Sequence, residues 1–329
     1  MLYRHQVLVL RSAAALSLCT SAFQANANDL LNNVLQQAIG HVITQGLQNA
    51  ANPGAPASPM LGSPATPATP SAVQNGPEVV LDNAADFPPH GIIQAWRQPG
   101  TIGMAPGPAG AVMGHVEMQT TYGGNLSLPG VATMRAKLDA LYSLLLSQPP
   151  LLNPQGVSIG PGGGLGHRRG GAVGPTVTGS LVIRAYPLKP DSKTTKRYPD
   201  GTQHTPGEGD ALNVLVNDTD ALRDPLPIGS YNGMTVLRRG GGYQLVVLNT
   251  TRPLLVNGVL NRDLIDPARP ASDIQFLVIY LGAASPTWSA LRKGQLHPAS
   301  GTGRLLGLMF NTDWRSLLKQ IETSKGQPS

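Results

Sequence analysis

Glycine and proline break this chain into short segments along most of its length. The 39 glycines and 30 prolines make up about a fifth of the 329 residues. Glycine weakens helices and strands, and proline removes a backbone hydrogen-bond donor from both. A bundle of long helices is therefore excluded, and so is a collagen triple helix, because glycine does not recur at every third position. The fold must consist of short elements joined by turns.

The first 27 residues have the layout of a secretory signal peptide. Arg4 and Arg11 precede a small and apolar stretch, and Ala27 is a residue of the size that signal peptidase selects. We expect cleavage after Ala27 and export of the mature chain to the periplasm or the extracellular medium. Two other interpretations are an ordinary first helix and lipid attachment at Cys19.

Cleavage at this position changes the charge and the cysteine content of the mature chain. The 24 basic residues become 22 when Arg4 and Arg11 leave, against 18 acidic residues. Loss of Cys19 leaves no thiol, which excludes disulfides and multi-cysteine metal sites. The basic clusters at 167–169 and 193–197 are short, whereas nucleic-acid binders concentrate positive charge beside aromatic platforms. We expect no nucleic-acid partner, and no membrane span because every apolar run is shorter than about 18 residues.

Residues 28–50 predict a separate amphipathic helix, and residues 51–77 predict a disordered Pro/Ala-rich linker. Two apolar residues follow two polar ones repeatedly through 28–50, a pattern that a half-buried strand cannot accommodate. The polar face of this helix carries Asn and Gln but no Lys or Arg, so docking on its own domain or on a protein or envelope partner suits it better than a lipid surface. The seven prolines of the linker favour an extended spacer.

Residues 78–322 predict one α+β domain with a largely antiparallel sheet of short strands and two or three helices. Apolar residues recur at spacings of three and four over 131–145, which indicates a helix that ends before Pro149. A last helix is predicted to begin after Thr312 or Asp313, because either side chain can cap it. Strands outnumber helices and rarely alternate with them, which favours α+β over a doubly wound α/β fold.

The predicted strands are short runs rich in Val, Leu and Ile that lie between turn residues. The glycine tract at 156–174 is expected to be irregular, and 305–310 is expected to form a strand or an apolar turn. Residues 323–329 are expected to be a disordered tail. The strand predictions cover residues 116–122, 177–186, 212–216, 234–238, 243–248, 254–260 and 274–281.

Two glycine-rich segments resemble functional motifs in sequence but lack the flanking residues or the spacing that those motifs require. Ser158 lies in the G-x-S-x-G sequence of 156–160, but prolines on both sides prevent the helix that a nucleophile elbow requires. The glycines of 162–166 precede two arginines, but neither the P-loop nor the G-x-G-x-x-G spacing occurs. We therefore expect no bound cofactor.

The densest group of ionisable residues lies between the strands predicted at 177–186 and 212–216. Its members could act as acid and base in a secreted hydrolase, or could bind a divalent ion. Glycines and a proline among them make a pair of ordinary turns the simpler interpretation. The group comprises Asp200, His204, Glu208 and Asp210.

Two further sets of residues leave a binding role open. Asp218 and Asp220 offer oxygen ligands to calcium, but the central glycine and later glutamate of a calcium loop are missing. Trp96 and Trp288 would line a carbohydrate cleft if folding brought them together. We therefore predict a non-enzymatic exported protein that binds a partner or an envelope component. The hydrolase and a calcium-stabilised module are the alternatives.

Overall fold

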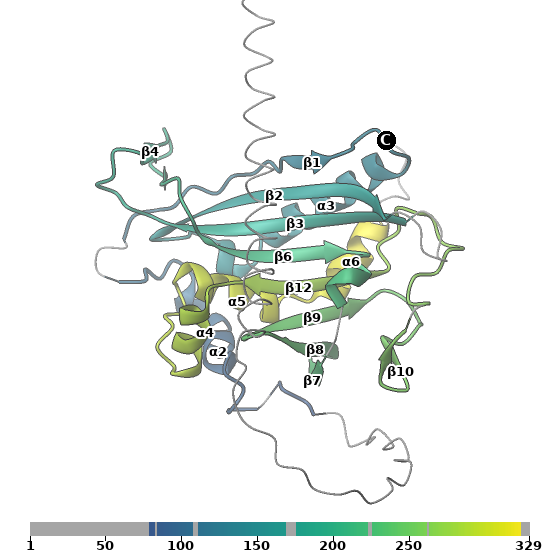
Figure 1. The fold of residues 1–329 in the computed structure, drawn as a ribbon. Helices are drawn as coiled ribbons and strands as arrows, with labels where there is room; N and C mark the ends of the chain where they lie inside the picture. The colour runs from purple at the N-terminus through teal and green to yellow at the C-terminus, as the bar shows by residue number, and fades with distance from the viewer. Residues whose placement is uncertain are drawn as a thin grey trace, which may run out of the picture. The chain divides into compact units, whose positions relative to one another are not determined.

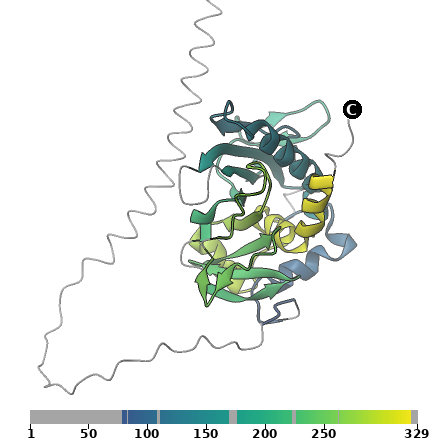
Figure 2. The ribbon, with the colours of Figure 1, turned by 90° about the vertical axis from the view of Figure 1, so that its right-hand side faces the viewer.

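The computed structural model describes the domain that follows the predicted linker. The predicted signal peptide, the helix at 28–50, the linker at 51–77 and the tail beyond Thr323 lie outside the described residues. In Figure 1 the described residues form one large sheet with helices behind it, and Figure 2 shows the dark blue α3 and the yellow α6 on the same side of the strands. The described ranges are 79–82, 84–107, 111–168, 176–222, 226–261 and 263–323.

The large sheet has eight strands in the order β1-β2-β3-β6-β12-β9-β8-β7. Neighbouring strands are antiparallel, except that β1 is parallel to β2. This arrangement confirms the predicted α+β class with a largely antiparallel sheet. The strands are β1 (Tyr122–Gly124), β2 (Val157–Arg168), β3 (Thr176–Pro187), β6 (Asp210–Val216), β7 (Leu226–Tyr231), β8 (Met234–Arg239), β9 (Gly242–Leu248) and β12 (Phe276–Gly282).

Two small hairpins lie outside the large sheet. The first pairs β4 (Lys196–Arg197) with β5 (Gln203–His204). The second pairs β10 (Leu255–Val256) with β11 (Val259–Leu260), where a single strand over 254–260 was predicted. The strand predicted at 116–122 is also wrong for most of its length, because only Tyr122 belongs to β1.

The described residues contain five α-helices, more than the two or three predicted. The periodicity over 131–145 is confirmed as α3, and the last helix is confirmed as α6. Asp313 caps α6, because its Oδ1 accepts a hydrogen bond from the Ser316 backbone N–H at 3.0 Å. The helices are α2 (His90–Trp96), α3 (Val131–Leu146), α4 (Ser285–Arg292), α5 (Gly301–Asn311) and α6 (Trp314–Thr323), with 3₁₀ turns η1 (Pro99–Thr101), η3 (Pro149–Leu151) and η4 (Thr219–Leu222).

The glycine tract is not irregular, since residues 157–168 of it form the long strand β2. The prediction failed because glycine has a low strand propensity. The apolar partner β3 compensates by pairing with every residue of β2, from Val157 opposite Pro187 to Arg168 opposite Thr176. Alternate residues of a strand face opposite sides, so Val157, Ile159 and Leu165 lie in the core. The glycines at 160, 162, 164 and 166 occupy the other face.

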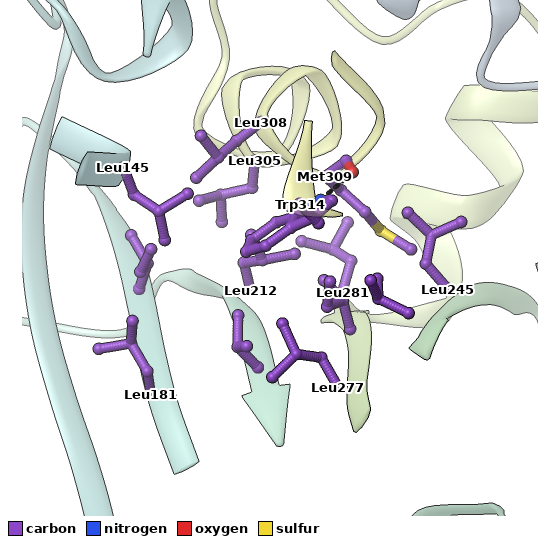
Figure 3. Packing of buried hydrophobic residues seen from close by; sticks show 14 of the residues in the cluster. Leu145, Leu181, Leu212, Leu245, Leu277, Leu281, Leu305, Leu308, Met309 and Trp314 are labelled. Atoms are coloured by element: carbon purple, nitrogen blue, oxygen red, sulfur yellow. Dashed lines mark hydrogen bonds between the residues drawn. The ribbon is translucent and has the colours of Figure 1, made fainter. Parts of the chain in front are cut away.

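Residues 305–310 belong to α5, not to a strand or turn. Every side chain from Thr302 to Phe310 is buried, because α5 contacts β3, β6 and β12 as well as α2. Figure 3 shows Leu305 and Leu308 of this helix facing leucines of the strands. A helix buried on all sides has no polar face, so its sequence lacks the periodicity by which helices are recognised.

Arg304 of α5 is a fully buried cation that binds carbonyl groups only. Its guanidinium donates to the carbonyl oxygens of Ala299 at 3.2 Å, Pro150 at 2.9 Å and Met104 at 3.0 Å. It also lies 5.2 Å from the centre of the Trp96 ring. Burial lowers the pKa of Arg304 to about 10, so the side chain stays charged at neutral pH.

We predict that Gly307→Ala destabilises the protein, because the indole of Trp96 occupies the space that a Cβ would take. Overpacking of this kind costs about 1–3 kcal/mol of the free energy of unfolding. Urea denaturation of the full chain measures it. Gly91→Ala in α2 is the control, since no atom lies within 4 Å of its added Cβ; its stability should be unchanged or higher. Equal stability of Gly307→Ala and wild type would contradict the packing described here.

Candidate functional site

The carboxylates proposed for acid–base chemistry each have a different environment. Thr202 donates to Asp200 Oδ1 through its backbone N–H at 2.9 Å and its hydroxyl at 2.7 Å, and these hydrogen bonds lower the pKa of Asp200. Glu208 is exposed, and Asp210 accepts a hydrogen bond from the Thr302 hydroxyl. Among the described residues, no group of three or more His, Cys, Asp or Glu side chains is arranged to hold a metal ion.

His204 instead contacts Ser158, the serine of the G-x-S-x-G sequence. The Nδ1 atom of His204 lies 2.8 Å from the Ser158 hydroxyl oxygen, and the imidazole is edge-on to Tyr186 with 5.1 Å between ring centres. Ser158 is 0% exposed and lies within a strand, whereas a nucleophilic serine must reach its substrate. The contact therefore serves to hold the β4–β5 hairpin against β2.

A second histidine fixes the same hairpin. The ring of His115 stacks on Tyr198 with 3.6 Å between centres and an interplanar angle of 4°. Its Nδ1 lies 3.1 Å from the Thr202 hydroxyl oxygen. Burial lowers the pKa of His204, and the charges of Lys196 and His115 lower it further, while Glu117 opposes them. His204 is therefore neutral at neutral pH.

The calcium candidates and the tryptophans lie in separate places. Asp218 Oδ1 accepts from the Asp220 backbone N–H at 3.0 Å, so it caps the short turn η4 after β6. The calcium site stays a prediction. Trp96 lies in the core, where its indole N–H donates to the carbonyl oxygens of Pro298 and Gly303, both at 3.1 Å. Trp288 forms part of a cavity wall to which Trp96 does not contribute.

This cavity, named here the α4 cavity, lies where the β8–β9 turn, the end of β12 and helix α4 meet. Its volume is about 290 Å³, close to the lower end of the range for small-molecule sites. Both charged side chains in its lining are arginines. The lining residues are Arg239, Gly241, Gly242, Tyr243, Tyr280, Leu281, Gly282, Ala283, Ser285, Trp288 and Arg292.

The two arginines of the α4 cavity come from different elements and are held separately. Arg239 is the last residue of β8, and its guanidinium lies 5.2 Å from the centre of the Tyr280 ring. One of its N–H groups points to the Ala221 carbonyl oxygen at 3.4 Å. Arg292 is the last residue of α4, and it donates to the Gly241 carbonyl oxygen at 3.3 Å. One guanidinium group thus belongs to the residue before the β8–β9 turn, and the other binds a carbonyl of that turn.

Trp288 shapes the wall of the α4 cavity through close contact with this turn. A Cβ on Gly242 would overlap the six-membered ring of Trp288, so the packing requires glycine there. Tyr243 meets Trp288 edge-on, with 5.9 Å between ring centres and an interplanar angle of 78°. Burial raises the pKa of Tyr243 and of Tyr280. Both hydroxyl groups therefore stay protonated at neutral pH.

Neither arginine of the α4 cavity forms an ion pair with a carboxylate of the described residues. Arg135, Lys137, Arg252 and Arg269 do so elsewhere in the fold. The buried Lys137 lies 3.2 Å from Asp273 and 2.9 Å from Glu322. The lining of the α4 cavity includes no Asp or Glu. It therefore carries a net positive charge.

Sequence reasoning identified Trp288 but missed the two arginines beside it. Arg239 precedes three glycines between the strands predicted at 234–238 and 243–248, and charged residues are usual in such a turn. Arg292 ends a helix of eight residues that the sequence analysis did not detect. The local signal available was the pair Arg238-Arg239 directly before a glycine-rich turn, and nothing in this pair indicates a cavity.

Comparisons with protein-family models, with curated proteins and with solved structures give no match. The chemistry of the α4 cavity is therefore inferred from its own residues. In the part of the chain that the structure describes, no helix is long and apolar enough to cross a membrane.

We predict that acidification weakens the fold through His204. Its pKa in the folded chain lies below the unfolded value of 6.5, so the unfolded chain binds more protons as the pH falls. The stabilisation by neutral His204 is complete above pH 6.5 and is lost as the pH falls through the lower, folded pKa. Urea denaturation between pH 8 and pH 5 measures this loss.

His204→Gln is the comparison variant, because glutamine does not titrate. Its free energy of unfolding should depend less steeply on pH than that of the wild type over the same interval. Identical slopes for the two proteins would show that His204 does not couple folding to pH.

Proposed function

We propose that this protein is an exported, non-enzymatic binding protein that holds a small anionic ligand in the α4 cavity. The observation that carries the proposal is that Arg239 and Arg292 both line this cavity and that neither forms an ion pair with a carboxylate of the described residues. Guanidinium groups form strong, charge-assisted hydrogen bonds with carboxylates and phosphates. An anion would thus supply the partner that the lining lacks.

Binding suits this cavity better than hydrolysis does. General acid–base catalysis near neutral pH needs a group whose pKa lies close to 7. The lining includes no His, Asp or Glu, and its tyrosine hydroxyls titrate above their usual range. The hydrolase alternative, with Asp200, His204, Glu208 and Asp210, stays a prediction that no contact described above favours.

The export and docking predictions belong to the same proposal. A signal peptide at 1–27 would direct the chain out of the cytosol, and the helix at 28–50 would bind a protein or envelope partner. The proline-rich spacer at 51–77 would then let the binding domain act at a distance from that partner. What supports this part of the proposal is the sequence pattern of these segments.

We predict that inorganic phosphate raises the melting temperature of the full chain and that Arg239→Ala/Arg292→Ala abolishes this effect. A ligand at a hundredfold excess over its Kd adds about 2.7 kcal/mol to the free energy of unfolding. Lys293→Ala is the matched control, because Lys293 follows Arg292 directly but does not line the cavity. A phosphate effect that persists in the double variant, or that is absent from the wild type, would count against this cavity as the binding site.

We predict that the protein recovered from a secreting host begins at Asn28, as measured by mass spectrometry of the intact chain. Ala27→Arg should block cleavage and leave the precursor, because signal peptidase requires a small residue before the cleaved bond. Cys19→Ser should be processed normally, which distinguishes cleavage after Ala27 from lipid attachment. A chain that still begins at Met1 in the cytosol would refute the proposed export.

A further inference from the structure

We infer that the α4 cavity selects ligands that carry two negative charges, as a phosphoryl group or as two carboxylates, over ligands with a single carboxylate. This inference rests on the proposed function, because it assumes that the cavity binds an anion. It adds the charge class of that anion.

The two guanidinium groups are positioned independently of a ligand. Arg239 is held by the Tyr280 ring at 5.2 Å and by the Ala221 carbonyl at 3.4 Å. Arg292 is held by the Gly241 carbonyl at 3.3 Å. A guanidinium has five N–H donors, and in each arginine these contacts use one of them. The remaining N–H donors of the two guanidinium groups are thus available to a ligand with several acceptor oxygens.

Charge balance favours a dianion over a monoanion. Two positive charges line the cavity, and the lining itself provides no negative charge, although the carboxylate of Asp218 is close enough to act on Tyr280. A single carboxylate would neutralise one guanidinium and leave the other uncompensated. The protein itself shows a balanced arrangement at Lys137 and Arg269, two cations that pair with the two carboxylates of Asp273 and Glu322. A ligand with two charges would give both arginines a partner.

Neutral donors at the same place add to this preference. Ser285, the first residue of α4, lines the cavity, and the first turn of α4 contains no acidic residue. No carboxylate of that turn therefore competes for the positive end of the helix dipole. Tyr280, whose hydroxyl is protonated, also lines the cavity. Phosphate and dicarboxylate ligands have enough oxygens to use these donors together with the guanidinium groups.

The test compares three ring-bearing probes of similar size by isothermal titration calorimetry on the full chain at pH 8 and low salt. Benzoate carries one charge, phthalate carries two carboxylates, and phenyl phosphate is a dianion at this pH because its second pKa is about 6. We expect at least one of the two dianions to bind tenfold or more tightly than benzoate. Tighter binding of phenyl phosphate than of phthalate identifies a phosphoryl site, and the reverse order identifies a dicarboxylate site. Equal affinity for the two dianions identifies a site that depends on charge alone. Benzoate binding as tightly as both dianions would overturn the inference.

Conservative variants separate this inference from the proposed function. Arg239→Gln and Arg292→Gln keep most of the side-chain volume at exposed positions, so both proteins should fold, as circular dichroism checks. Each should weaken binding of the preferred dianion by about tenfold to a hundredfold, and Lys293→Gln should leave it unchanged. If all three probes bind equally and both arginine variants weaken them equally, the dianion inference fails while the anion site stands. If no probe binds and inorganic phosphate also fails, both proposals fail.

Discussion

Helix α5 has no side that faces water, because α2 and three strands of the sheet pack against it. Its leucines, Met309 and Phe310 fill the space between the sheet and α2. Full burial of one such side chain contributes about 1.5–3 kcal/mol relative to exposure. The chain then turns directly into α6, where the indole of Trp314 donates to the Met309 carbonyl at 2.9 Å. The eleven residues of α5 thus fix the positions of α2 and α6 relative to the sheet.

The antiparallel pairing of β9 with β12 explains why the α4 cavity forms at the edge of the core. In this pairing the start of β9 lies beside the end of β12, with Tyr280 opposite Gln244. The β8–β9 turn and the first residues of α4 are therefore neighbours in space, although about forty residues separate them in the chain. Arg239 and Arg292 line the same cavity because the strand register brings these two ends together. Figure 1 shows α4 at the end of the sheet where β12 stops.

Local patterns in the sequence were enough to predict one helix with a clear helical period and five short apolar strands bounded by turn residues. Helix α3 and strands β3, β6, β8, β9 and β12 all lie where periodicity and turn residues placed them. The elements that were missed depend on contacts distant in sequence. Strand β2 is glycine-rich, and it forms a strand because β3 pairs with it. Helix α5 is surrounded by apolar neighbours, so its sequence shows no alternation of apolar and polar residues with the helical period. The site was missed for the same reason, because Arg239, Tyr280 and Arg292 belong to three elements. A contact such as that between Ser158 and His204, 46 residues apart, leaves no local signal.

The buried guanidinium of Arg304 has a consequence for the way the domain opens. Its three carbonyl partners belong to segments around residues 104, 150 and 299, which are otherwise far apart in the chain. If one of these segments detached, a desolvated charge would lose part of its coordination while it remained buried, which is costly. The three segments therefore do not fray independently. A single side chain thus couples three segments, which we expect to open together and not one by one.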